Sequence, residues 1–377
     1  MIYLDNAATT RTDERVLEEM TPYFLEKYGN PSSAHAFGKD ARKAMEDARA
    51  MVAKTINANS GEIVFTSGGT ESDNLAILGA VNGNGFKSIA TTVIEHPAVK
   101  NVFKYLESKG VTARYFPVSR EGVLEVEVVK AALDEGVQFV SVMHANNEVG
   151  SIQPIKEIGA LCRKKKAVFH VDAVQSLGKL KIDVRDLNVD LMSFSSHKIH
   201  GPKGVGALYV REGLRIDPIV KGGGHERGRR SGTENVPGIV GFAKAVELSH
   251  KEFDSNVNKM TKLRNKLIDG ALEIKDSWLN GSREKRLCNN ANIGFKHAEG
   301  EALVFELSGK GIAVSTGSAC SSHSLEDSPT LMALGLSHSE AHSSLRFTLS
   351  HFNTDKEIDT VLQELPKAVS RFRGISL

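Results

Sequence analysis

Short apolar runs alternate with segments of helical periodicity over the first two-thirds of this sequence, and this alternation constrains the fold most. The predicted strands are residues 63–66, 88–94, 137–143, 167–171, 191–194 and 206–210. The predicted helices among them are residues 71–80, 96–109 and 155–165. Strands that alternate with helices of ten or more residues build mostly parallel sheets covered on both faces. We therefore expect an α/β domain around such a sheet.

The last third of the chain has a different pattern. It contains a largely helical stretch from 236 to about 274, short predicted strands at 292–295, 312–315 and 345–349, and a closing helix at 355–372. This order favours a smaller α+β domain that is joined to the first through the long helix. We place the large domain at residues 16–257 and the small one at 258–377, together with 1–15.

Length, charge and cysteine usage limit the function classes. The chain of 377 residues is long enough for two domains. Its 48 Lys+Arg and 46 Asp+Glu give a formal charge of +2, which argues against nucleic-acid or polybasic membrane partners. No secretory signal and no apolar run of about 20 residues occurs. The three widely spaced cysteines exclude a disulfide framework. We expect a cytoplasmic enzyme.

Polar clusters follow five predicted strands. They are SGGTE at 67–71, EH at 95–96, HANN at 144–147, DAVQ at 172–175 and SSHK at 195–198. Ligands of open α/β sheets bind outside the carboxyl ends of the strands. The five clusters therefore predict one ligand crevice.

Three of these clusters suggest a phosphate-bearing aldehyde cofactor. Small residues before the helix at 71–80 allow its amides to approach a phosphate, with Thr70 as the expected N-cap. Lys198 follows a buried strand, where partial desolvation activates an amine toward carbonyls. Asp172 ends the preceding strand and can hold a proton on a heterocyclic nitrogen. Pyridoxal phosphate requires all three groups. Each of these groups, taken alone, also has an ordinary explanation: the glycine-rich segment as a capped turn before a helix, and the charged residues as solvated loop charges.

The cysteines differ in their surroundings. Cys320 lies in a run of small residues after a predicted strand, where a thiol can be exposed. Cys162 falls on the apolar side of a predicted helix and is expected to be a packing residue. Cys288 has no identifiable partner. The 13 histidines lack HExxH or zinc-type Cys/His spacing, and we expect no metal site.

The sequence as a whole resembles the cysteine desulfurases of the NifS and IscS type, within the class V aminotransferase family. The motifs that carry the resemblance are YLDNAATT (3–10), YGNPSSAH (28–35), FTSGGTES (65–72), HANNE (144–148), HVDAVQ (170–175), SSHK (195–198), GGGHER (222–227), RSGT (230–233) and SAC (318–320). The resemblance implies the fold type I of pyridoxal phosphate enzymes. In that fold a mostly parallel seven-stranded sheet flanked by helices forms the large domain.

The resemblance also implies a role for each matching residue. Lys198 would bind the cofactor covalently and move protons, and His96 would stack on the ring and assist. The other implied cofactor contacts are Gly69, Thr70, Asn147, Asp172, Gln175, Ser195, His197 and, from a second subunit, Thr233. Thr233 therefore implies a homodimer with shared active sites.

The implied reaction removes sulfur from L-cysteine and yields L-alanine. Arg346, together with Asn147, would bind the substrate carboxylate, although an arginine along a strand edge would be the ordinary explanation. Cys320 would take up the sulfur as a persulfide and pass it to an iron–sulfur scaffold or another acceptor protein. We expect residues 318 to about 329 to be flexible, because Cys320 must reach both sites.

Two departures from the family pattern occur. Gly69 stands where alanine is common, and Ser350-His351 stands where Gly-Arg is common, which would alter the charge near the carboxylate site. The alternatives are a selenocysteine lyase, another class V aminotransferase, or an inactive binding scaffold. Cys320 argues against transamination, and the complete set of implied residues argues against a scaffold.

Overall fold

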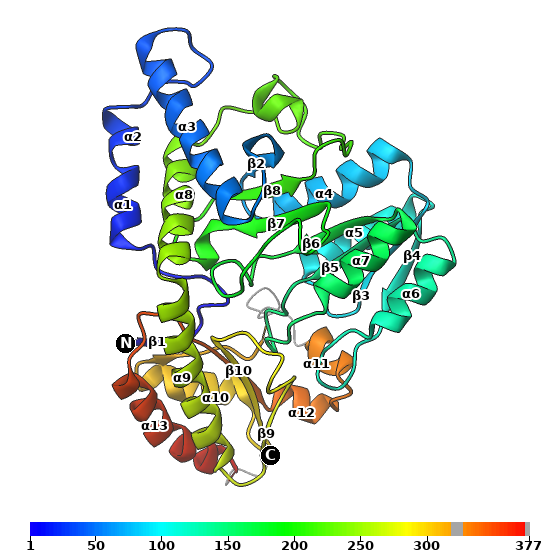
Figure 1. The fold of residues 1–377 in the computed structure, drawn as a ribbon. Coiled ribbons are helices and arrows are strands. Elements are labelled where there is room, and N and C mark those ends of the chain that lie inside the picture. Colours follow the sequence, from blue (N-terminus) through cyan, green and yellow to red (C-terminus); the bar gives the residue numbers. More distant parts are fainter. Residues whose placement is uncertain (318–326, 374–377) are drawn as a thin grey trace.

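The computed structural model describes residues 1–317 and 327–373, which form two layered units (Figure 1). The larger unit is built on a seven-stranded sheet of order β2-β8-β7-β6-β5-β3-β4. Its strands are β2 (Ile63–Thr66), β3 (Ser88–Thr92), β4 (Thr112–Phe116), β5 (Phe139–Met143), β6 (Val168–Asp172), β7 (Leu191–Ser195) and β8 (Gly206–Val210). Only β8 runs against its neighbours. The predicted mostly parallel sheet is confirmed.

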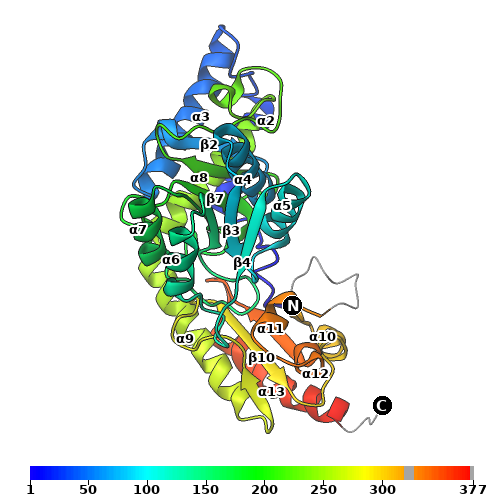
Figure 2. The same cartoon turned by 90° about the vertical axis from the view of Figure 1, so that its right-hand side faces the viewer.

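Helices cover both faces of this sheet, as Figure 2 shows nearly edge-on. One face carries α4 (Gly69–Asn84) and α5 (Pro97–Ser108), packed on the apolar side chains of the strands. The other face carries α1 (Glu14–Met20), α3 (Ala36–Thr55), α6 (Val126–Asp134), α7 (Ile155–Lys165) and α8 (Val236–Lys251). A short helix α2 (Pro22–Leu25) and the 3₁₀ turns η1 (Ser60–Glu62), η2 (Ser196–Lys198) and η3 (His225–Gly228) lie between these elements. Burial on both faces explains why β5 to β8 are buried throughout.

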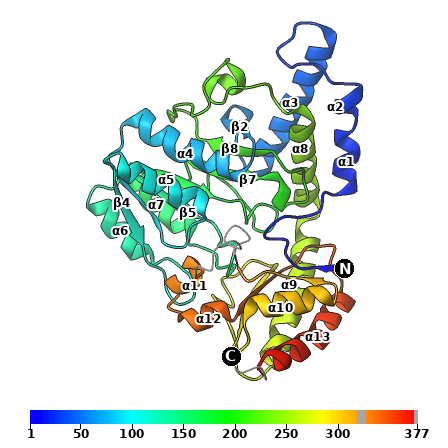
Figure 3. The same ribbon diagram turned by 180° about the vertical axis from the view of Figure 1, so that it is seen from behind.

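The smaller unit has its own apolar core. It contains the antiparallel sheet β12-β10-β9, with β9 (Ser277–Leu279), β10 (Asn290–Phe295) and β12 (Ser344–Thr348), and the parallel pair β1 (Ile2–Tyr3) and β11 (Ile312–Ala313). The helices α9 (Phe253–Leu272), α10 (Gly300–Gly309) and α13 (Asp355–Arg373) pack around them. The N-terminus thus lies beside the last third of the chain, as Figure 3 shows from behind.

Two short helices lie where the units meet. They are α11 (Pro329–Ala333) and α12 (His338–His342), and their apolar residues cluster with Ile94, Met143 and Val149 of the larger unit. Within the described residues, no helix combines the length and apolar character that crossing a membrane requires.

The sequence patterns located most elements but not all of them. The expected stretch from 236 to about 274 is two helices, because the chain turns between Lys251 and Phe253. The helices α3 and α6 and the strand β4 were not predicted, since their apolar residues are spread among charged ones. The predicted strand at 312–315 is only the two residues of β11. These differences leave the positions of the polar strand ends unchanged.

Candidate active site

A cavity of about 230 Å³ lies at the carboxyl ends of the central strands. Its lining includes ten of the residues singled out from the sequence: Gly69, Thr70, His96, Asn147, Asp172, Gln175, Ser195, His197, Lys198 and Arg346. Ala7, Ala8, Asp73, Met143, Ala145 and Val174 complete it. The strand register explains why these residues lie close together, because Met143, Asp172 and Ser193 are neighbours across β5, β6 and β7. Thr233 lies elsewhere, exposed in the loop before α8, and Cys320 lies outside the described residues.

Lys198 projects from the turn η2 that follows β7. Its Nζ donates hydrogen bonds to the carbonyl oxygens of Ala7 and Ala8, at 2.5 and 2.7 Å. Gln175 donates through Nε2 to the same Ala7 oxygen at 3.0 Å. The N-terminal segment therefore closes one side of the cavity against the lysine. Sequence reasoning assigned no role to this segment, although its motif was one of those that carried the resemblance.

Asp172 presents a buried carboxylate at the end of β6. Its Oδ1 accepts the amide of Val174 at 2.9 Å, and among the described residues no second group donates to the carboxylate. Burial raises the pKa of Asp172 to about 6, while the Val174 amide and the Lys198 ammonium oppose the rise. The carboxylate thus has an acceptor position available within the cavity.

A second carboxyl group, Asp73 on α4, lies behind Asp172 and was missed by sequence reasoning. It is fully buried, and both burial and the neighbouring Asp172 raise its pKa well above the ordinary value. Two adjacent buried carboxyls do not both ionise readily. Asp73 therefore holds the proton, and Asp172 carries the negative charge toward the cavity. Only the fold reveals this pair, because the two residues are far apart in sequence.

The N-terminus of α4 forms another wall of the cavity. Gly68, at a φ of 151°, is the N-cap and offers no side chain, so the first helical amides remain open to a ligand. The expectation that Thr70 caps this helix is wrong, since the glycine turn starts the helix earlier. A Cβ added at Gly69 would lie 2.7 Å from Val174 Cγ2, so the loop that follows β6 approaches the start of α4 closely here. Ser195 and His197 face the same space. Such a helix end attracts anions.

Two histidines of the cavity are neutral. Burial and the nearby Lys198 lower the pKa of both His96 and His197 to about 4. His96 is the N-cap of α5, and its Nδ1 accepts the amide of Ala98 at 3.1 Å, which leaves the proton on Nε2. His197 Nδ1 lies 3.1 Å from the hydroxyl of Thr9. Each ring therefore keeps its Nε2 available.

Arg346 contributes the positive charge on the side of the smaller unit. It belongs to the edge strand β12, yet only 1% of the residue is exposed. Its Nη2 pairs with Asp5 Oδ1 at 2.8 Å, and its Nη1 donates to the carbonyl of Asn147 at 3.2 Å. Its Nε has no acceptor among the described residues. A buried guanidinium with an unused donor is suited to binding a carboxylate.

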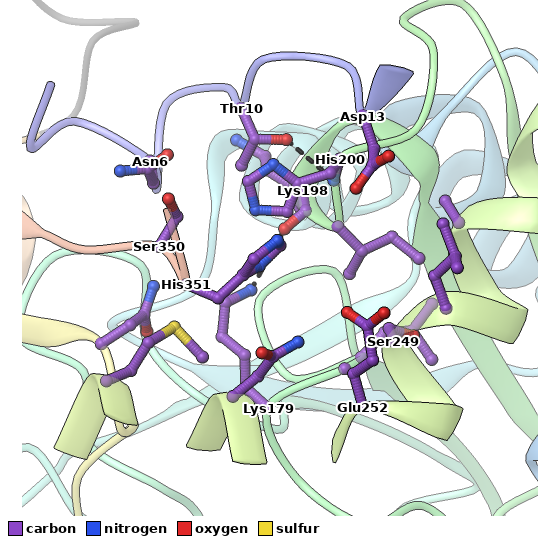
Figure 4. A pocket seen from close by; sticks show the side chains of 18 of the residues that line it. Asn6, Thr10, Asp13, Lys179, Lys198, His200, Ser249, Glu252, Ser350 and His351 are labelled. Atoms are coloured by element: carbon purple, nitrogen blue, oxygen red, sulfur yellow. Dashed lines mark hydrogen bonds between the residues drawn. The ribbon is translucent and has the colours of Figure 1, made fainter. Parts of the chain in front are cut away.

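A smaller cavity of about 40 Å³ is also lined by Lys198 (Figure 4). Lys179 is buried there and donates to the Lys198 carbonyl at 3.3 Å, and burial lowers the pKa of Lys179 to about 8. The rings of His200 and His351 meet at a centroid distance of 4.5 Å. The structure thus places His351, which departs from the family pattern, in this second cavity.

The two described cysteines are buried and lack a free, ionised thiol. Cys162 lies in α7, as its helical pattern predicts, and burial raises its pKa to about 12. Cys288 has a pKa raised by burial to about 11. Neither thiol meets the requirement of a thiolate nucleophile.

A chain whose mostly parallel sheet, glycine-capped helix end, buried aspartate and lysine surround one cavity has the architecture of a pyridoxal phosphate enzyme of fold type I. Comparison with known families identifies it further: the model for aminotransferase class-V matches residues 2–361, and the chain belongs to this family. It groups within the family with cysteine desulfurases of the NifS and IscS type.

The relatives are similar over their full lengths. The chain is 48% identical to "Cysteine desulfurase IscS 1" of Archaeoglobus fulgidus, covering 100% of this chain and 99% of the relative. It is 47% identical to "Cysteine desulfurase IscS" of Methanosarcina thermophila, covering 100% and 93%. Among solved structures, a "NIFS-LIKE PROTEIN" has 42% identity and a TM-score of 0.93 over 98% of this chain and 99% of that chain. Another, "SspA in complex with cysteine", has 35% identity and a TM-score of 0.83 over 94% and 100%.

Proposed function

We propose that this protein is a cysteine desulfurase that uses pyridoxal phosphate to convert L-cysteine to L-alanine. The sulfur would form a persulfide on Cys320 and pass to an acceptor protein for iron–sulfur cluster assembly. The observation that carries the proposal is the convergence of Lys198, Asp172 and Arg346 on one cavity. One site thereby combines the amine of Lys198, the carboxylate of Asp172, which can accept a hydrogen bond from a protonated ring nitrogen, and the guanidinium of Arg346, which can bind a substrate carboxylate.

The cavity fits the cofactor in three respects. The open amides of α4, with Thr70, Ser195 and His197 beside them, suit a phosphate. The unused acceptor position of the Asp172 carboxylate suits a protonated ring nitrogen. Lys198 enters the same space with its amine. When bound, pyridoxal phosphate withdraws electrons from the Cα of an amino acid and so weakens the bond between Cβ and sulfur.

The residues of the chain would divide the remaining tasks. Arg346 binds the substrate carboxylate through its fork, and Asn147 lies next to it. Lys198 and His96 hold and move the proton at the substrate Cα, since both line the cavity and His96 is neutral. Gln175 and Asn147 would contact the cofactor's phenolic oxygen, and Asp172 its ring nitrogen.

Sulfur transfer would take place at Cys320. Its thiolate attacks the sulfur of the substrate, a new bond between the two sulfurs forms, and the bond between Cβ and sulfur breaks. The carbon fragment keeps the bonding electrons, takes up protons and leaves as alanine. The buried thiols of Cys162 and Cys288 are poor alternatives for this role.

We further propose that the protein is a cytoplasmic homodimer, in which Thr233 of one subunit completes the phosphate site of the other. Thr233 is exposed and outside the cavity of its own chain, which agrees with a contact across subunits. The protein would have two domains. The large one would be residues 16–257, and the small one would be residues 258–377 together with 1–15. Their largely separate apolar cores support this division.

The test is product analysis with competing substrates. The protein loaded with pyridoxal phosphate is expected to release alanine from L-cysteine, and Lys198→Ala to abolish this release. Lys109→Ala, a matched change of an exposed lysine at the C-terminal end of α5, should have no effect. Alanine from selenocysteine alone would favour the lyase alternative. Amino-group transfer to a keto acid would favour an ordinary aminotransferase. If no substrate is turned over, the result would favour a binding scaffold.

A further inference from the structure

A cluster of one carboxylate and two imidazoles lies away from the proposed catalytic cavity. Asp327 directly follows residues 318–326, and His338 and His342 belong to α12, near the junction of the two units. One ligand atom from each of the three residues lies within 4.8 Å of the others. Sequence reasoning gave these residues no role.

The local structure explains why the two imidazoles share a face. Ser337 caps α12, and its hydroxyl and the Glu340 carboxylate form a reciprocal capping box that fixes the first turn. Residues four apart on a helix lie above one another, so His338 and His342 project in the same direction. Their ring centroids are 4.4 Å apart.

The carboxylate of Asp327 lies between the two rings. His338 Nδ1 is 2.7 Å from Asp327 Oδ1 and 2.8 Å from Oδ2. His342 Nε2 is 2.9 Å from the same Oδ1. Yet both Asp327 Oδ1 and His342 Nε2 are shielded from solvent and lack a hydrogen bond of acceptable geometry among the described residues. Two buried polar atoms that face each other without a proper hydrogen bond are suited to a shared partner.

We propose that Asp327, His338 and His342 bind a first-row divalent transition metal ion of the zinc class. Imidazole nitrogens and a carboxylate oxygen are ligands of Zn²⁺ at about 2.0–2.2 Å, and tetrahedral ligands at this distance lie about 3.4 Å apart. The present separations of 2.7 and 2.9 Å would widen by about 0.7 and 0.5 Å to reach that value. His338 is 72% exposed, so an ion has a route from solvent, and water can fill the remaining position.

The position of the site has a structural consequence. The ion would fix Asp327, where the chain leaves residues 318–326, to α12, which leads directly into the strand that carries Arg346. The proposal itself does not depend on the enzymatic activity, because it rests on three side chains outside the catalytic cavity.

Calorimetric titration with Zn²⁺ tests this proposal. The full chain, loaded with pyridoxal phosphate, carries Cys320→Ser so that this thiol does not compete for zinc. We expect one saturable site that is weakened at least about tenfold by His338→Ala and by His342→Ala. His250→Ala, which removes an exposed histidine from the last turn of α8, is the matched control and should keep the site.

A stability measurement separates metal binding from a simple hydrogen-bonded triad. Zn²⁺ is expected to raise the melting temperature of the reference chain and of His250→Ala, but not of His338→Ala or His342→Ala. The same melting curves, recorded without metal, report whether each variant is folded. The proposal is overturned if either of the two α12 variants keeps the zinc affinity of the reference chain, or if that chain shows no saturable site.

Discussion

Replacement of Arg346 by lysine tests the assignment of the carboxylate site. Lysine keeps the positive charge but loses the planar fork that binds a carboxylate through two hydrogen bonds. Each hydrogen bond to a charged group contributes about 1.5–3 kcal/mol, so the loss of one, together with poorer geometry of the other, costs about 3 kcal/mol. At 1.36 kcal/mol per factor of ten, we expect kcat/KM for L-cysteine to fall roughly 150-fold.

The comparison substrate is L-cysteine methyl ester, which lacks the carboxylate. Its kcat/KM should change less than about fivefold, because the interaction that the variant removes is not made with this substrate. The ion pair between Arg346 and Asp5 could also affect folding, and Asp5→Asn, which removes its other member, serves as the structural control. Equal losses for cysteine and its ester would refute the role of Arg346 in binding the carboxylate.

Three further predictions concern buried titratable groups. Asp172→Asn should lower kcat on the order of 10²-fold in steady-state assays, because the neutral amide no longer stabilises a protonated ring nitrogen; an unchanged kcat would contradict this. Glu226→Ala should lower the free energy of unfolding by about 3–5 kcal/mol in urea titrations, because it removes the buried carboxylate that accepts from both Nη atoms of Arg49. Glu46→Ala, at the half-exposed partner of the same arginine, should cost less than about 1 kcal/mol. Burial lowers the pKa of His170 from 6.5 to about 3, so the unfolded state binds more protons between these values and stability should fall as the pH falls through this range. His170→Gln should make that dependence shallower, and an identical slope would contradict it.

The polar strand ends were predictable because their positions follow from sheet geometry. The patterns around Asp172 and Lys198 place each residue at the end of a buried strand, and parallel strands bring such ends together. The resemblance then supplied roles for His96 and Arg346, which no periodicity indicates. The cap of α4 was assigned wrongly, since a glycine turn and a threonine cap give similar sequences.

The remaining features depend on contacts between distant segments. Asp73 lies on a helix, and its effect on Asp172 arises only when α4 packs on the sheet. No sequence pattern distinguishes Glu226 from other loop residues, yet its carboxylate accepts hydrogen bonds from both Nη atoms of Arg49 and from the amide of Phe65. The spacing of His338 and His342 is visible in the sequence, but a ligand set with Asp327 is visible only in three dimensions. Such contacts are set by packing rather than by local pattern.

The most direct measurement of the central claim is the intact mass of the peptide that contains Cys320. The protein loaded with pyridoxal phosphate is treated with L-cysteine in the absence of reductant, and the peptide is then analysed. We predict one added sulfur atom on Cys320, and none when Lys198 is replaced by alanine. An unmodified Cys320 in a protein that still produces alanine would contradict the account, because sulfur would then leave by another route.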